Sequence, residues 1–194
     1  MLARGDTKKK IANAIIFFAQ NATTSGKPLG MTKLMKLLFY FDCEFYTQTG
    51  FSSTGLDYYA WQQGPVPKDV WHNLHGDNDL LNLKKSVRVL QVRDDDLQMA
   101  ITPTQKFDGT EFTDLELELL EQISFMYQEL TATQISTLSH EKDKPWDVTR
   151  NTKGDKTLID YNLSLPKSLT EEDLEEFRER QQDYEFFSSA FGGM

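Results

Sequence analysis

The sequence predicts an α+β fold that is predominantly α-helical: a compact helical domain with a small antiparallel sheet and an acidic, amphipathic C-terminal helix. Three observations lead to this prediction. Apolar residues recur at helical spacing through residues 31–49. Residues 86–92 and 97–101 have the character of two short strands. Residues 168–194 combine an aromatic stripe with most of the chain's excess negative charge.

The N-terminal part of the chain predicts a helix over residues 8–21. Its apolar side chains fall along one side: Ile11, Ala14, Ile15, Phe18 and Ala19. Residues 22–30 are rich in Ser, Thr, Gly and Pro, a composition typical of loops. A second helix is therefore expected to begin near residue 31.

This second helix is apolar on most of its sides. One stripe comprises Leu34, Leu37, Leu38, Phe41 and Phe45, and further apolar residues extend it around the cylinder: Met31, Met35, Phe39, Cys43 and Tyr46. A helix of this kind is usually central and packed by several neighbours. Lys36, Asp42 and Glu44 are its polar interruptions. Gly50 is placed to end it, because glycine readily adopts the left-handed conformation.

An aromatic segment follows, and residues 56–63 predict a short strand. Gly64, Pro65 and Val66 are expected to end it with a rigid turn that presents its neighbours at little entropic cost. Side chains alternate along a strand, so Tyr59 and Trp61 share one face while Tyr58 takes the other. We expect Trp61 to pack on the central helix and Tyr58 to be exposed, where it can anchor a partner.

The middle of the chain carries the two predicted strands, joined by three aspartates at residues 94–96 that suit a solvated turn. Two capping boxes then mark helix starts. They are Thr113-x-x-Glu116 and Thr131-x-x-Gln134. A short apolar stretch at residues 158–165 precedes the last helix.

The C-terminal helix is predicted from Ser168-x-x-Glu171 to about residue 190. Residues 168–194 hold eight acids and two arginines, whereas the whole chain has a net charge of −9. A narrow aromatic and apolar stripe, broken by Gln181, runs along the helix: Leu174, Phe177, Tyr184, Phe187 and Phe191. Either the stripe docks on the domain's own core, or the helix covers a basic partner as a helix in a groove.

Composition excludes several classes of protein. The chain of 194 residues is long enough for one domain with a real core, which we place at residues 1–167, with residues 168–194 as an acidic helical extension. A single cysteine gives no disulfide framework, and we expect neither a signal peptide nor a membrane span. A cytoplasmic location is expected. The negative charge disfavours binding to nucleic acid.

No pattern of catalytic or cofactor-binding residues is evident. Cys43 lies on the apolar helix and is expected to be an inert, buried thiol. His72 and His75 are interpreted as surface or capping residues rather than zinc ligands, and His140 as the end of a helix with Trp146 as an anchor beyond it. No glycine-rich phosphate loop is present. We therefore expect no cofactor, no metal and no enzymatic activity.

Three segments carry a family resemblance: KLMKLLFY at residues 33–40, YYAWQQGPVPKDVW at residues 58–71 and LSHEKDKPW at residues 138–146. With them, roughly residues 8–150 resemble the Panacea domain of the SocA-like antitoxins, found in bacterial and phage toxin–antitoxin systems. The resemblance implies a mainly helical domain with a small sheet. It also implies a non-enzymatic protein that neutralises a cognate toxin by binding it.

The function expected is therefore that of an antitoxin whose partner is a cognate toxin protein, in a homo- or hetero-oligomeric state that the sequence leaves open. The candidate contacts come from the aromatic segment, the SHEKDKPW segment and the last helix: Tyr58, Trp61, Gln63, Gly64, Pro65, Val66, His140, Trp146, Phe177, Tyr184 and Phe187. Two alternatives remain. One is a DNA-binding autoregulatory transcription factor, and the other is an adaptor that delivers the toxin to a protease.

Overall fold

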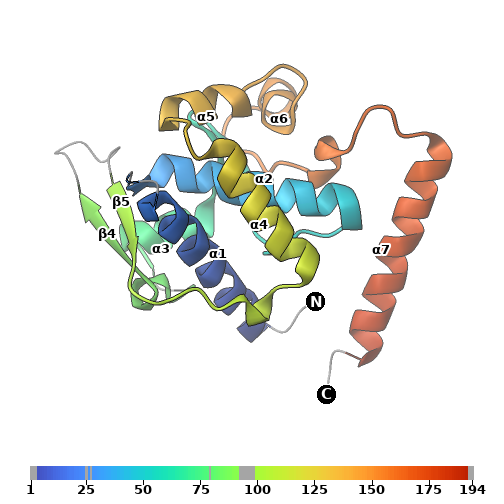
Figure 1. The fold of residues 1–194 in the computed structure, drawn as a ribbon. Helices are drawn as coiled ribbons and strands as arrows, with labels where there is room; N and C mark the ends of the chain where they lie inside the picture. The colour runs from blue at the N-terminus through green and yellow to red at the C-terminus, as the bar shows by residue number, and fades with distance from the viewer. Residues whose placement is uncertain (1–3, 25, 27, 79, 92–98, 192–194) are drawn as a thin grey trace.

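The computed structural model describes residues 4–24, 26, 28–78, 80–91 and 99–191. It is the predicted helical α+β fold (Figure 1). The helices are α1 (Arg4–Thr24), α2 (Met31–Thr49), α3 (Lys68–His75), α4 (Asp114–Tyr127), α5 (Ala132–Ser139), α6 (Pro145–Lys153) and α7 (Glu171–Phe191). The strands are β1 (Leu29–Gly30), β2 (Tyr58–Trp61), β3 (Gly64–Pro67), β4 (Val87–Gln91) and β5 (Met99–Pro103). Single 3-10 turns are η1 (Leu83–Lys85), η2 (Gly109–Glu111) and η3 (Tyr161–Ser164).

Helix α2 is the centre of the fold, as its apolar pattern predicts. It contacts α1, α4, α5, β1, β3, β5 and η3, and Leu34, Leu38 and Phe41 on it are fully buried. Gly50 ends the helix with φ 86°, and its N–H donates to the Tyr46 carbonyl at 2.8 Å. The predicted helix and its glycine stop are both confirmed.

A buried ionic contact joins α1 to α4. Lys10 Nζ lies 2.8 Å from Glu116 Oε1, which also accepts a hydrogen bond from Ser53 Oγ at 2.6 Å. Glu116 is at the same time the third residue of α4 and closes the capping box that begins at Thr113, and the box that begins at Thr131 is likewise present. Both predicted caps are confirmed, and the first one also ties α1 and the segment after α2 to the start of α4.

The three-stranded sheet has the order β1-β5-β4 and is antiparallel, with Leu29 and Val89 both opposite Ile101. The two strands predicted at residues 86–101 are confirmed. The aspartate turn predicted at residues 94–96 lies outside the described residues. The sheet packs on α1 and α2 through β5, and Ala100 and Ile101 of this strand are buried.

The β2–β3 hairpin corrects the prediction of a turn at residues 64–66. Gly64, Pro65 and Val66 form a strand that pairs with β2, and the hairpin turns at Gln62 and Gln63 instead. Pro65 is tolerated because it lies opposite Ala60, whose N–H donates to the Thr157 carbonyl and whose carbonyl accepts from Lys156 N–H. The pair is therefore not hydrogen-bonded, and the missing proline N–H leaves no partner unsatisfied.

The orientation of β2 is also opposite to the one expected. Tyr58 is 1% exposed, and its ring centroid lies 5.2 Å from that of Phe39 on α2. Its hydroxyl donates to Asp42 Oδ2 at 2.7 Å. Trp61, on the other face, is half-buried. The prediction of an exposed Tyr58 is wrong because the buried carboxylate of α2 offers the phenol an acceptor, which alternation along the strand does not reveal.

Helix α7 lies on the side of the molecule opposite β4 and β5 (Figure 1). Thr170 and Asp173 cap it, rather than Ser168 and Glu171: Thr170 N–H donates to Asp173 Oδ2 at 2.7 Å, and Asp173 N–H donates to Thr170 Oγ at 3.2 Å. Thr170 is the residue directly before the first helical one, which is the position that a cap needs.

The first half of α7 docks on the C-terminal end of α2. Phe177 is 5% exposed, with its ring centroid 5.5 Å from that of Tyr46. Gln181, which interrupts the aromatic stripe, donates to the Gly50 carbonyl at 2.7 Å and to the Tyr46 hydroxyl at 3.1 Å. Docking on the domain's own core therefore occurs at Phe177. The side chains of Tyr184 and Phe187 lie outside the described residues.

Gly64 offers a test of the hairpin packing. At φ 106° a Cβ would lie 2.6 Å from Ser139 Oγ and 2.7 Å from Lys36 Cε, whereas Gly154 at φ 93° has open space around it. We expect Gly64→Ala to lower the free energy of unfolding by about 3 kcal/mol, and the control Gly154→Ala by about 1 kcal/mol. Denaturant titration measures both. Equal losses would show that β3 is not held tightly against α5 and α2.

Phe177 tests the docking of α7. We expect Phe177→Ala to lower the free energy of unfolding by about 2 kcal/mol, because it removes a buried aromatic ring from one side of the core. Gln182→Ala is the control, since this exposed residue lies on the same helix. Thermal and denaturant unfolding give the values. A Phe177→Ala protein as stable as the control would mean that the helix does not dock in solution.

Candidate functional site

The β2–β3 hairpin gathers aromatic residues that are far apart in the sequence. Trp146, at the start of α6, donates its Nε1–H to the Trp61 carbonyl at 2.8 Å. The ring centroids of Trp61 and Trp71 lie 5.3 Å apart, His75 stacks on Trp71 at 3.7 Å, and His140 stacks on Trp146 at 3.8 Å. All five side chains are half-buried. We call Trp61, Trp71, His75, His140 and Trp146 the tryptophan surface.

Cationic side chains border this surface. Lys156 Nζ lies 5.9 Å from the centre of the Trp61 ring, and the Arg150 guanidinium lies 5.6 Å from that of Trp146. Lys68 Nζ lies 4.6 Å from the ring of Tyr59, next to Trp61 on β2. Arg150 also pairs with Asp155. A chain with a net charge of −9 thus presents an aromatic region with basic side chains along its edge.

A buried lysine of α2 contacts the hairpin on its side toward the core. Lys36 of α2 is 1% exposed, and its ammonium donates to the Pro65 carbonyl at 3.3 Å. Burial removes water from the amine and lowers the pKa of Lys36 from 10.5 to about 7. A second contact fixes the hairpin turn, where Ser136 Oγ of α5 donates to the Gln63 carbonyl at 3.4 Å. Gln62 and Gln63 remain exposed at its tip.

His140 ends α5, as the sequence interpretation has it, and Trp146 is the anchor beyond it. Burial lowers the pKa of His140, and the positive charges of Lys36 and Arg150 lower it further, while the backbone of Gln63 acts in the opposite direction. The lowered pKa favours the neutral form of the imidazole, which stacks on Trp146. Burying a neutral imidazole under a partner costs less free energy than burying a charged one, because no charged group has to be desolvated.

The structure brings together only part of the predicted contact set. Trp61, His140 and Trp146 belong to the tryptophan surface, Gln63 is exposed beside it, and Gly64 is buried beneath it. Pro65, Val66 and Tyr58 are buried, which leaves them as its support. Phe177 lies apart from this surface, because it packs on Tyr46 in the last turn of α2, about 15 Å along the helix from Lys36 at 1.5 Å per residue.

Sequence reasoning did not identify Trp71, His75, Arg150 or Lys156 as neighbours of this site. Trp71 was visible in the YYAWQQGPVPKDVW segment, and its stacking on His75 at four residues' spacing is a helical-face signal. Arg150 has the same signal, because it follows Trp146 by four residues on α6. Lys156 had no such signal, and it reaches the surface because residues 156–159 run along the free edge of β2.

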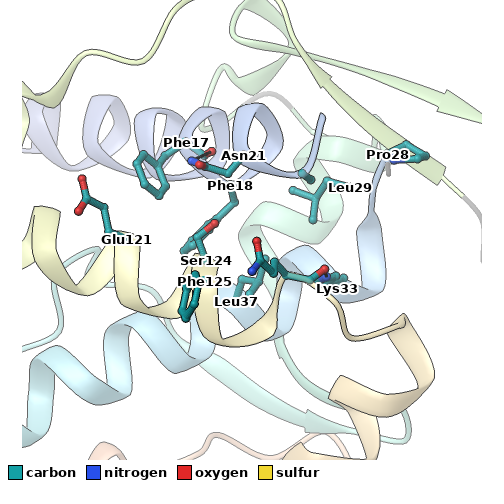
Figure 2. Close-up of a pocket in the computed structure, with 12 residues that line it drawn as sticks. Phe17, Phe18, Asn21, Pro28, Leu29, Lys33, Leu37, Glu121, Ser124 and Phe125 are labelled. Carbon is teal, nitrogen blue, oxygen red and sulfur yellow. Dashed lines mark hydrogen bonds between the residues drawn. The ribbon is translucent and has the colours of Figure 1, made fainter. Parts of the chain in front are cut away.

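Apart from the tryptophan surface, a groove lies between α1 and α4 and has a volume of about 490 Å³ (Figure 2). Figure 2 shows Phe17 of α1 and Phe125 of α4 on its two sides, with Leu29 and Leu37 also in its wall. Phe125 is 75% exposed. Lys33 at the rim donates to the Gln128 and Leu130 carbonyls, both at 2.8 Å. This groove suits an apolar group more than acid–base chemistry.

The remaining titratable groups have structural roles. Asp42 is fully buried, which raises its pKa to about 6, and it accepts hydrogen bonds from Thr54 and Tyr58. Burial also raises the pKa of the Cys43 thiol, in line with an inert cysteine. His72 pairs with Asp77 at 2.8 Å, so His72 and His75 do not converge. Among the described residues, no three His, Cys, Asp or Glu side chains gather as a metal site.

The family of this chain is shown by comparison with models of known families. A family model described as "Antitoxin SocA-like, Panacea domain" matches residues 34–147. This chain belongs to the Panacea family of SocA-like antitoxins. The match runs from the second turn of α2 into α6 and contains every residue of the tryptophan surface, whereas α7 lies outside it. No curated protein and no solved structure is significantly similar to the chain.

The part of the chain that the structure describes holds no helix both long and apolar enough to cross a membrane.

Lys36 gives a prediction with a defined pH dependence. Between about pH 7 and pH 10.5 the unfolded chain binds a proton on Lys36 that the folded chain does not, so this residue's contribution to stability falls as the pH falls toward 7. Lys36→Met removes both this linkage and the burial of the amine. We expect the variant to be about 2 kcal/mol more stable at pH 7 and to lose this advantage toward pH 10.

Denaturant titrations of the wild type and of Lys36→Met at several pH values measure the effect. Lys153→Met is the matched control, because Lys153 is exposed at the end of α6 and should leave the pH profile unchanged. A constant difference between Lys36→Met and wild type from pH 7 to pH 10 would contradict the lowered pKa of Lys36.

Proposed function

We propose that this chain is an antitoxin that neutralises its cognate toxin by direct binding, with the tryptophan surface as the main contact. Membership of the antitoxin family supports the biological role. The observation that carries the choice of surface is the cluster of three tryptophans and two histidines around the β2–β3 hairpin. Tryptophan, tyrosine and arginine are the residues most enriched among energetic hot spots of protein interfaces.

The contacts behind this surface support the proposal because they hold it in place before a partner arrives. Three side chains donate hydrogen bonds to backbone carbonyls of the hairpin: Trp146 to that of Trp61, Ser136 to that of Gln63 and Lys36 to that of Pro65. A partner then loses little side-chain and loop entropy on binding, so more of the contact energy appears as affinity. Inhibition would be stoichiometric, and it requires no reaction on the antitoxin.

The described arrangement favours a protein partner over DNA. The acidic balance of the chain opposes the phosphate backbone, and the basic groups near the hairpin are few and partly paired, as Arg150 is with Asp155. An adaptor that carries the toxin to a protease would use the same surface with a different outcome. The cellular half-life of the toxin, measured with and without this chain, separates these two roles.

Helix α7 is proposed as an acidic extension of a domain formed by residues 1–167. Its first half is anchored through Phe177 and Gln181. Glu172, Glu176 and Glu179 remain exposed on it. We retain Tyr184 and Phe187 as candidate contacts of its distal half with a basic partner. In this role α7 would add to the tryptophan surface rather than replace it.

The proposal is tested by co-expressing this chain with the product of the neighbouring gene. We expect rescue of growth and co-purification of the two proteins. A variant at the exposed hairpin tip, Gln62→Arg/Gln63→Arg, should abolish rescue and weaken binding by tenfold or more, because bulky charges enter the contact without disturbing the core. Calorimetry gives the affinities, and thermal unfolding confirms that the variant folds.

Gln48→Arg is the matched control, since Gln48 is an exposed glutamine near the other end of α2. It should rescue growth like the wild type. If the wild-type chain neither rescues growth nor binds the neighbouring product, direct neutralisation of that protein is wrong. If binding occurs and the tip variant binds equally well, the function stands and the tryptophan surface is not the contact.

A further inference from the structure

A smaller cavity, of about 200 Å³, lies between α2, α4 and the turn from α5 to α6. Its wall includes Phe39, Tyr40 and Glu44 of α2, Tyr127 of α4 and Glu141 of the turn, which we call the tyrosine pocket. Sites for small molecules usually occupy about 300–1,000 Å³. A cavity below this range suits a single long side chain better than a free metabolite.

Aromatic rings form one side of the tyrosine pocket. Tyr40 and Tyr127 are stacked with their ring centroids 4.7 Å apart, and Phe39 lies 5.9 Å from Tyr40 in a tilted arrangement. Both tyrosines are half-buried, so part of each ring borders the cavity. Cations bind favourably against aromatic rings, and arginine does so more often than lysine.

The wall of the tyrosine pocket also contains two carboxylates, those of Glu44 and Glu141. Burial raises the pKa of Tyr127, and the negative charges of Glu44 and Glu141 raise it further, because both act on its hydroxyl. Glu44 and Glu141 are exposed, and neither forms an ion pair within the described residues. Lys144 is the one cation among the residues of the wall, which leaves a net charge of −1.

We infer that the tyrosine pocket receives an arginine side chain of the toxin, with its guanidinium between Glu44 and Glu141 and against Tyr40 and Tyr127. The aromatic wall takes the planar cation, and the two carboxylates neutralise it. Arginine fits better than lysine because its planar, weakly hydrated group stacks on rings and pairs with carboxylates in a fork. The inference rests on the proposed function and specifies the chemistry of the partner.

The position of the pocket connects it with the tryptophan surface. Ser139 and Pro145 belong to the pocket wall, while their neighbours His140 and Trp146 belong to the tryptophan surface. The five-residue turn between α5 and α6 therefore separates the two sites. A toxin seated on the tryptophan surface needs to extend only across this turn to place an arginine in the pocket.

The test compares Glu44→Gln/Glu141→Gln with the matched control Asp57→Asn/Glu118→Gln, which changes the net charge equally at two exposed acids outside the pocket. We expect the pocket variant to bind the toxin about tenfold more weakly than the wild type, with a smaller dependence on salt. The control should stay within about twofold of the wild type. Thermal unfolding checks that both variants fold.

A second measurement does not depend on the toxin. Arginine amide is titrated into the labelled protein, with citrulline amide as its uncharged analogue, and backbone NMR shifts are followed. We expect arginine amide alone to shift the signals of Tyr40, Tyr127 and Glu141, and the pocket variant to lose this response. A tenfold loss of toxin affinity that is confined to the pocket variant supports the inference by itself.

The outcomes separate the two proposals. Absence of toxin binding by the wild type contradicts the proposed function, and the amide titration then decides whether the pocket binds a cation. An amide response with unchanged toxin affinity would overturn the assignment of the pocket to the toxin. Unchanged toxin affinity without an amide response would overturn the pocket as a cation site. Equal losses of toxin affinity in the pocket variant and the control would show that the net charge of the chain, and not the pocket, causes the loss, which would overturn the inference.

Discussion

Enclosure of α2 on most of its sides is the constraint on which the rest of this structure depends. A helix so enclosed can keep polar side chains only where neighbouring segments satisfy them. Asp42 is met by Thr54 and by the hydroxyl of Tyr58, and Lys36 by the Pro65 carbonyl. These contacts determine where the segment after α2 and both strands of the hairpin lie. The position of the tryptophan surface follows from two buried polar groups.

The candidate contact regions lie at successive positions along α2. Lys36 contacts β3 of the hairpin, Glu44 borders the tyrosine pocket about two turns later, and Gly50 contacts α7 at the far end. Basic groups thus gather at one end of the helix and acidic groups at its middle and other end, whereas aromatic rings occur in all three regions. A partner that covers several of these regions would meet different chemistry in each, which favours specificity for one toxin over general adhesion.

The buried polar groups also explain why perturbed pKa values here indicate support rather than catalysis. Lys36, Asp42, Tyr58 and Cys43 all titrate abnormally, and burial is the first cause for each. Shifted pKa values gather at active sites only when such groups face a substrate. These side chains face the interior of the protein instead. The half-buried rings and exposed carboxylates around them are the groups that a partner can reach.

Local interactions made several features predictable from the sequence. These are most of the helices but not α6, the glycine stop at Gly50, the capping boxes at Thr113 and Thr131, and the family. Tertiary structure decided the features that depend on distant partners. Asp42 set which face of β2 is buried, Thr157 and Lys156 made room for Pro65 in a strand, and Trp61 met Trp146 across 85 residues. Alternation and capping act within a few residues, whereas a buried hydrogen bond is satisfied by whichever segment the packing brings to it.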